Sequence, residues 1–169
     1  MTIVILGVGN RIRGDDAIGS IIAEEILRLA QNDRQFMCHS EGAEATEESH
    51  KLIIYDTETT PENFIEKVVR LKPDRLIFID ACNFGGQAGE YKLFQEEEIK
   101  DIAYGLLSTH TLPLVLTIEL IKKQHNCKVA LLGIQPKQFD MGSDMSPEIV
   151  KVKNNIIEYL QSIVKNNLN

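Results

Sequence analysis

The sequence has few cysteines, no excess of positive charge and no long hydrophobic run. Its 169 residues include three cysteines, Cys38, Cys82 and Cys127, without a CxxC pair. This pattern argues against a disulfide framework or a zinc knuckle and favours free thiols in a reducing compartment. The 18 basic and 25 acidic residues give a net charge of −7, which disfavours a surface that neutralises a phosphate backbone. We therefore expect neither a disulfide-rich secreted protein nor a nucleic-acid-binding protein.

The sequence also shows no pattern typical of a signal peptide or of a membrane-spanning helix. The first residues have no basic segment and no small-residue cleavage site, and the apolar run breaks at Gly7. The longest apolar candidate, residues 112–121, is interrupted by Pro113, Thr117 and Glu119, whereas a membrane helix needs about 18 consecutive apolar residues. We expect a cytoplasmic protein without membrane insertion.

The sequence does contain alternating strand-like and helix-like segments. Continuous apolar runs at residues 3–8, 52–55 and 75–79 are typical of central parallel strands that are buried on both faces. Residues 129–134 form a further strand candidate, and residues 91–94 alternate between polar and apolar side chains, which predicts an edge strand. The pattern predicts a single-domain α/β fold over residues 1–169, with three layers: a mostly parallel, twisted sheet of about five strands and helices on both faces.

Helices are predicted between these strands. Residues 17–29 carry an apolar stripe at helical spacing. In Thr60-Pro61 and Ser146-Pro147 a hydroxyl residue precedes a proline, which predicts that a capped helix begins at each place. The helix that begins after Thr60 is expected to end near Leu71. The apolar stretch after His110 predicts a largely buried helix.

Residues 31–51 are longer than an ordinary connection between a helix and a strand. They include four glutamates, Glu41, Glu44, Glu47 and Glu48. We favour a solvated surface insertion. A lid that contacts a partner is the alternative.

Polar residues that follow strands are the candidates for chemistry, because sites in such sheets form beyond the carboxyl ends of the strands. The glycine turn after the first strand has Ile12 where a dinucleotide-binding turn needs glycine, and no phosphate-binding Gly-Lys-Ser/Thr follows it. Asp15 and Asp16 also place negative charge where a helix would bind phosphate. We therefore expect this edge of the sheet to bind a cation.

Three residues form a candidate metal set, each from a different strand end or loop. Asp16, Asp80 and His110 offer two carboxylates and an imidazole, which suit a divalent metal such as nickel or zinc. Asp56 follows another strand and is a candidate for orienting a ligand. Asn10 is expected either to steady the first loop or to donate to the peptide carbonyl of a substrate.

The motifs together resemble one family, the hydrogenase maturation endopeptidases, which trim the large subunit of nickel-iron hydrogenases. They occur in the order of that family and cover most of the chain. The matching pieces are Gly7-x-Gly9-Asn10, Gly14-Asp15-Asp16, Thr60-Pro61-Glu62-Asn63, Asp80-Ala81, Gly89-Glu90, Ser108-Thr109-His110 with Pro113, and Gly133-Ile134-Gln135-Pro136.

The resemblance implies a peptidase that removes a C-terminal extension from the hydrogenase large-subunit precursor once nickel has been loaded. It assigns nickel binding and catalysis to Asp16, Asp80 and His110, with the nickel supplied by the precursor as a recognition signal. The chain departs from the family at Ala17, where glycine is usual, and in the insertion at residues 36–50.

Three alternatives stay open at this point. The chain could be a non-catalytic scaffold, or another metal-binding maturation factor, that checks the nickel state of the precursor. Asp16 and Asp80 could act without metal as an aspartic-protease-like pair that shares a proton. Ser108 or Cys82 could act as a nucleophile, although neither lies in a nucleophile elbow, and we interpret Cys82 as a buried filler.

Overall fold

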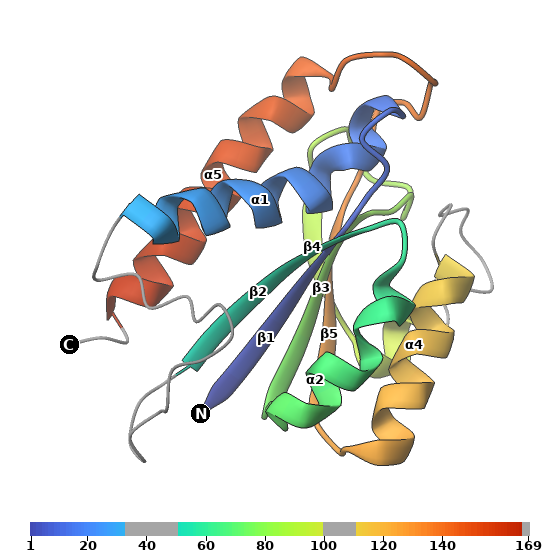
Figure 1. Cartoon of the computed structure of the whole chain (residues 1–169). Helices are drawn as coiled ribbons and strands as arrows, with labels where there is room; N and C mark the ends of the chain where they lie inside the picture. The colour runs from blue at the N-terminus through green and yellow to red at the C-terminus, as the bar shows by residue number, and fades with distance from the viewer. Residues whose placement is uncertain (33–50, 100–110, 167–169) are drawn as a thin grey trace.

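The computed structural model describes residues 1–32, 51–99 and 111–166, whose strands form one five-stranded sheet (Figure 1). The strand order is β2-β1-β3-β5-β4. Four strands are parallel, and β4 pairs antiparallel with β5 at the edge. All five predicted strands are present, and β4 is an edge strand as predicted. Their bounds are β1 (Thr2–Val8), β2 (Lys51–Glu58), β3 (Arg75–Ala81), β4 (Tyr91–Gln95) and β5 (Lys128–Ile134). The central position expected for residues 52–55 is wrong, because β2 forms the opposite edge of the sheet. Its apolar run is continuous because Ile53 and Ile54 pack into the apolar layers on opposite faces.

Helices cover both faces of the sheet, as predicted. One face packs against α1 (Ile18–Asn32) and α5 (Pro147–Asn166), and the other against α2 (Ile65–Leu71) and α4 (Thr111–Gln124) (Figure 1). Two short 3-10 turns, η1 (Gly14–Ala17) and η2 (Pro61–Phe64), lead into α1 and α2. Of the insertion predicted at residues 31–51, residues 31 and 32 belong to α1 and Lys51 begins β2. Residues 33–50 lie outside the described residues.

The two predicted helix starts are in the right place, but the hydroxyls play other roles. Thr60 makes no side-chain cap, and its hydroxyl donates to the Thr57 carbonyl at 3.4 Å. Ser146 precedes α5, and its hydroxyl donates 2.9 Å to Asp15 in a distant turn. The capping prediction is therefore wrong for Thr60, and at Ser146 the hydroxyl contributes a tertiary contact that local sequence does not reveal.

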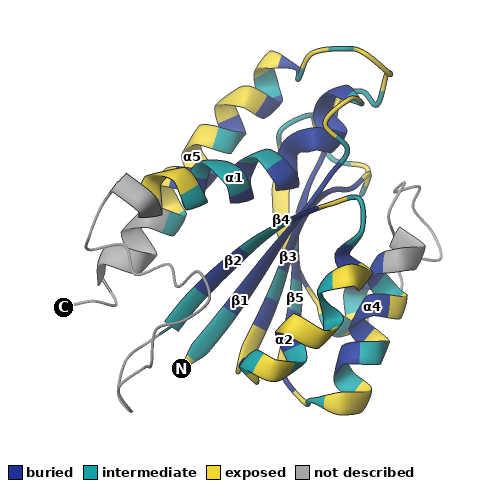
Figure 2. Cartoon of the chain, in the orientation of Figure 1, coloured by how far each residue is buried: buried dark blue, intermediate teal, exposed yellow. Residues whose placement is uncertain are grey.

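The core consists of two apolar layers, one on each face of the sheet. Ile5 and Leu6, which are consecutive in β1, are both at most 2% exposed and belong to different layers. This explains the continuous apolar run, since both faces of a central strand are covered. Burial is deepest in the carboxyl halves of β1 and β3 (Figure 2). No helix in the described ranges is long and apolar enough to cross a membrane.

Glycines allow α1 to lie directly on the strands. A Cβ at Gly19 would lie 2.0 Å from the Ile79 carbonyl oxygen and 2.2 Å from that of Val8. A Cβ at Gly7 would lie 2.2 Å from the Gly19 carbonyl oxygen. The first turn of α1 can rest on the carboxyl ends of β1 and β3 because these positions carry no side chain.

We expect Gly19→Ala to lower the free energy of unfolding by about 3 kcal/mol, because its methyl group meets main-chain atoms that cannot move aside easily. The exposed helical change Asn154→Ala is the control and is expected to be neutral or slightly stabilising. Urea unfolding measures both. Equal midpoints for the two variants would contradict the close approach of α1 to the sheet.

Candidate functional site

The carboxyl edge of the sheet brings together two of the three predicted site residues. Asp16 lies in η1, immediately before α1, and Asp80 lies near the end of β3. Since the start of α1 rests on the ends of β1 and β3, and η1 contacts β3, both aspartates belong to the same edge. Asp16 is 0% exposed and Asp80 is 1% exposed.

The third predicted residue, His110, lies outside the described residues, as does Ser108. Within the described ranges, no group of three or more His, Cys, Asp or Glu side chains is arranged to hold a metal ion. The metal set of Asp16, Asp80 and His110 therefore remains a prediction, of which the structure places two members at one edge of the sheet.

Asp15, expected from the sequence only to add negative charge at this edge, has a structural role. Its carboxylate is 0% exposed. Oδ2 accepts hydrogen bonds from the main-chain N–H of Lys137 at 2.8 Å and of Gln138 at 3.1 Å, and from the Ser146 hydroxyl at 2.9 Å. Oδ1 accepts the Ser146 N–H at 2.6 Å. A single carboxylate thus ties η1 to both ends of the loop between β5 and α5, which we call the 137–146 loop.

The glycine turn after β1 is filled by main chain. A Cβ at Gly9 would lie 2.3 Å from the Asp16 carbonyl oxygen, which also accepts the Asn10 N–H at 3.1 Å. The Asn10 side chain accepts the Ile12 N–H at 3.1 Å, so it steadies the loop as predicted. These glycines serve close packing, in agreement with the rejection of a dinucleotide-binding turn.

Asp56 binds a cation of this chain. Its Oδ2 lies 2.5 Å from Nη2 of Arg11, whose Nη1 lies 2.5 Å from Oε2 of Glu24. Arg11 Nε also donates to the Ser20 hydroxyl at 2.9 Å. The hydrogen bond to Glu24 is the main cause that raises the pKa of Arg11, and burial opposes it. Asp56 therefore connects β2 to the glycine turn through Arg11.

The loop that follows Asp80 is organised by Gln135, which belongs to the Gly-Ile-Gln-Pro motif. The Gln135 side-chain oxygen accepts the N–H groups of Phe84 at 2.9 Å and Gly86 at 3.1 Å. Its side-chain nitrogen donates to Asn83 at 3.1 Å. This explains the motif physically, since the amide of a buried glutamine satisfies the main chain of the loop next to Asp80.

Cys82 is unsuited to act as a nucleophile. It is a free, buried thiol, and burial, with a smaller contribution from the charge of Asp80, raises its pKa to about 12. The thiolate is the reactive form, so almost none is present near neutral pH. A Cβ at Gly133 would lie 2.3 Å from the Cys82 sulfur, in agreement with a packing role.

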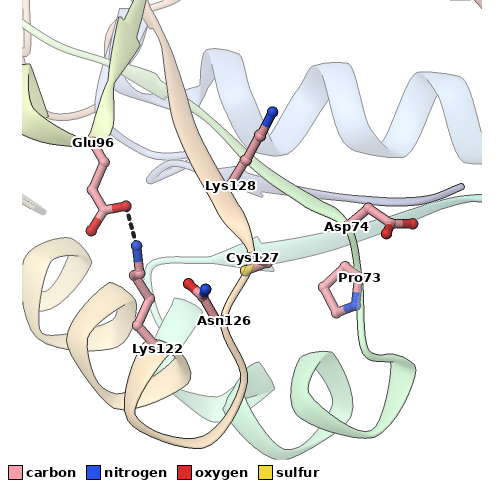
Figure 3. A pocket seen from close by; sticks show the side chains of 7 residues that line it. All are labelled: Pro73, Asp74, Glu96, Lys122, Asn126, Cys127 and Lys128. Carbon is pink, nitrogen blue, oxygen red and sulfur yellow. Dashed lines mark hydrogen bonds and ion pairs between the residues drawn. The ribbon is translucent and has the colours of Figure 1, made fainter.

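A pocket of about 390 Å³ lies at the opposite end of the sheet (Figure 3). Its lining residues precede or begin β3 and β5, lie near the end of α4 or, in the case of Glu96, follow β4. Glu96 and Lys122 form an ion pair on one side of it. Because Asp74 and Lys128 stand at the amino ends of their strands, this pocket is separate from the edge that carries Asp16 and Asp80.

Known proteins resemble this chain over most of its length. A family model described as hydrogenase maturation protease matches residues 38–165. The hydrogenase 3 maturation protease of Escherichia coli is 30% identical over 136 residues, which are 80% of this chain and 74% of that protein.

Solved structures agree with this similarity. The crystal structure of a NiFe hydrogenase maturation protease from Thermococcus kodakarensis superposes with a TM-score of 0.75 at 30% identity, covering 97% of this chain and 92% of that one. The solution structure of an endopeptidase from Escherichia coli gives a TM-score of 0.72 at 26% identity, covering 96% and 90%.

We expect Asp15→Ala to destabilise the protein by about 2–3 kcal/mol, because the buried N–H of Ser146 and the partly buried N–H groups of Lys137 and Gln138 lose their acceptor, and a buried donor left without an acceptor costs about 1–3 kcal/mol. The exposed aspartate Asp140 lies in the 137–146 loop, and Asp140→Ala is expected to change stability by less than about 0.5 kcal/mol. Chemical denaturation checks both. An Asp15 variant as stable as the Asp140 variant would show that the hydrogen bonds of Asp15 do not stabilise the 137–146 loop.

Proposed function

Because the chain belongs to the hydrogenase maturation protease family, we propose that it removes a C-terminal extension from the nickel-loaded large-subunit precursor of a nickel-iron hydrogenase. The family match makes the chain a peptidase, so the non-catalytic scaffold considered from the sequence is disfavoured. The nickel of the precursor is cargo in this proposal, and it marks a precursor that is ready to be cut.

The observation that carries the proposal is the burial of Asp16 and Asp80 at one edge of the sheet. Two buried carboxylates favour a divalent cation, because opposite charges attract each other more strongly in the protein interior than in bulk water. His110 precedes α4 in the sequence and is the proposed nitrogen ligand.

The proposed role of each residue follows from the chemistry of carboxylates and imidazole. Asp16, Asp80 and His110 would complete the coordination of the nickel and so position the scissile peptide at the carboxyl edge. A divalent metal beside a peptide bond supplies polarisation of the carbonyl. A carboxylate oxygen of this chain would accept a proton from the attacking water. The metal-free alternative keeps Asp16 and Asp80 as a pair that shares one proton.

The proposal predicts nickel-dependent processing. The purified chain is incubated with nickel-loaded and with nickel-free large-subunit precursor from the same organism, and mass spectrometry measures loss of the C-terminal peptide. We expect cleavage of the loaded precursor only. Equal cleavage of both precursors would overturn recognition of nickel, and stronger cleavage without metal at acid pH would favour the aspartic pair.

Replacing one proposed ligand at a time should slow cleavage strongly without unfolding the protein. We expect Asp16→Asn, Asp80→Asn and His110→Gln each to reduce cleavage of the loaded precursor by at least about 100-fold, because each removes a group that acts on the reacting centre. Glu158→Gln makes the same carboxyl-to-amide change at an exposed position of α5 and is the control. Circular dichroism verifies the fold, and folded variants with normal cleavage would exclude the residue concerned.

A further inference from the structure

Two large apolar side chains are exposed at the carboxyl edge, beside the turn that carries Asp16. Ile12, in the glycine turn, is 59% exposed, and Met141, in the 137–146 loop, is 67% exposed. The two segments come from opposite ends of the chain and meet at the top of the molecule, where exposed residues are drawn on both (Figures 1 and 2). We call this pair the Ile12/Met141 platform.

Hydrogen bonds hold the two halves of the platform together. The Gly142 N–H donates to the Ile12 carbonyl at 2.8 Å, and Arg13 Nε donates to the Phe139 carbonyl at 3.4 Å. The contact is close at Gly14, where a Cβ would lie 2.5 Å from the Ser143 hydroxyl. Ile12 and Met141 therefore belong to one assembled surface.

Hydrogen bonds within the 137–146 loop, and hydrogen bonds from the loop to Asp15, also hold it in place. Asp15 binds main-chain N–H groups at both ends of it, and the Ser143 hydroxyl donates to the Asp140 carbonyl at 2.8 Å. The Gln138 side chain donates to the Asp144 carbonyl at 3.2 Å. A surface held in this way loses little conformational freedom when it binds, so exposed apolar groups on it contribute efficiently to affinity.

The platform is continuous with the candidate site. The Asp16 N–H donates to the Arg13 carbonyl, and the Asp16 carbonyl accepts the Asn10 N–H, both at 3.1 Å. Ile12 thus lies inside the hydrogen-bonded turn that ends at Asp16. Of the cations near it, Arg11 pairs with Glu24 and Lys137 pairs with Glu148, and Arg13 donates to the Phe139 carbonyl. The exposed side chains of Ile12 and Met141 therefore add apolar contact to this surface.

We propose that the Ile12/Met141 platform docks an apolar side chain of the precursor polypeptide, next to the segment that is cut. This inference rests on the proposed function, since a polypeptide processed at the carboxyl edge must approach the turn that carries Asp16. Burial of Ile12 and Met141 against the precursor would set how tightly it binds, while Asp16 and Asp80 act on the bond that breaks.

The test compares steady-state cleavage of the nickel-loaded precursor by the wild type and by the double variant Ile12→Ser/Met141→Ser. We expect KM to rise about 10-fold or more, because the lost apolar contact weakens docking, while kcat changes by less than about 2-fold. The unfolding midpoint should not move, since both side chains are exposed. The conservative double variant Ile12→Val/Met141→Leu should retain the wild-type KM.

Leu93→Ser is the matched control, because Leu93 is 49% exposed on β4 and is not part of the platform. It should leave KM unchanged. An unchanged KM in the serine double variant, or a fall in kcat alone, would overturn the docking role. If the wild type itself fails to cleave the loaded precursor, the proposed function fails, and this result is distinct from failure of the platform.

Discussion

The carboxylate of Asp15 is sealed from water, and a buried negative charge is tolerated only where donors surround it. Its donors are Lys137, Gln138 and Ser146, which belong to the connection between the last strand and the last helix. The η1 turn is therefore hydrogen-bonded to this connection. The start of α5, the path of the 137–146 loop and the orientation of η1 all depend on this interaction.

A second constraint acts from the opposite side of η1. Gly7 and Gly19 allow the backbone of α1 to touch β1 and β3, so the turn that carries Asp16 cannot move away from the strand that carries Asp80. The Gln135 side chain then orders the loop directly after β3. Main-chain contacts and buried amides thus position the carboxyl edge, and its two aspartates are supported on rigid elements, which favours precise chemistry.

Sequence patterns predicted the strands of the sheet well, because a strand covered on both faces has a continuous apolar run. The same pattern misplaced β2, an edge strand that is also covered on both faces. The mixed polar and apolar pattern of β4 indicated an edge strand because most of its side chains are exposed. The rule that sites follow strand ends selected Asp16 and Asp80. The role of Asp15 could not be predicted, because three of its four donors are main-chain N–H groups of a remote loop, and main-chain donors leave no signature in the sequence. The fourth donor, the Ser146 hydroxyl, was expected to cap its own helix. The Thr60 cap failed because its hydroxyl bonds to Thr57 instead.

The rigidity of this edge bears on how a small peptidase could select its substrate. Ile12 and Asp16 lie in one hydrogen-bonded turn, so a polypeptide that bound at the proposed platform would be held in a fixed relation to the carboxylates. Binding and positioning then draw on the same contacts, and a precursor that docks badly also presents its peptide badly. Because burial raises the pKa of the Cys82 thiol to about 12, this thiol offers no competing nucleophile. Under the proposed function, selectivity would then depend on the platform, on the geometry of the carboxylates and on the nickel that the precursor carries.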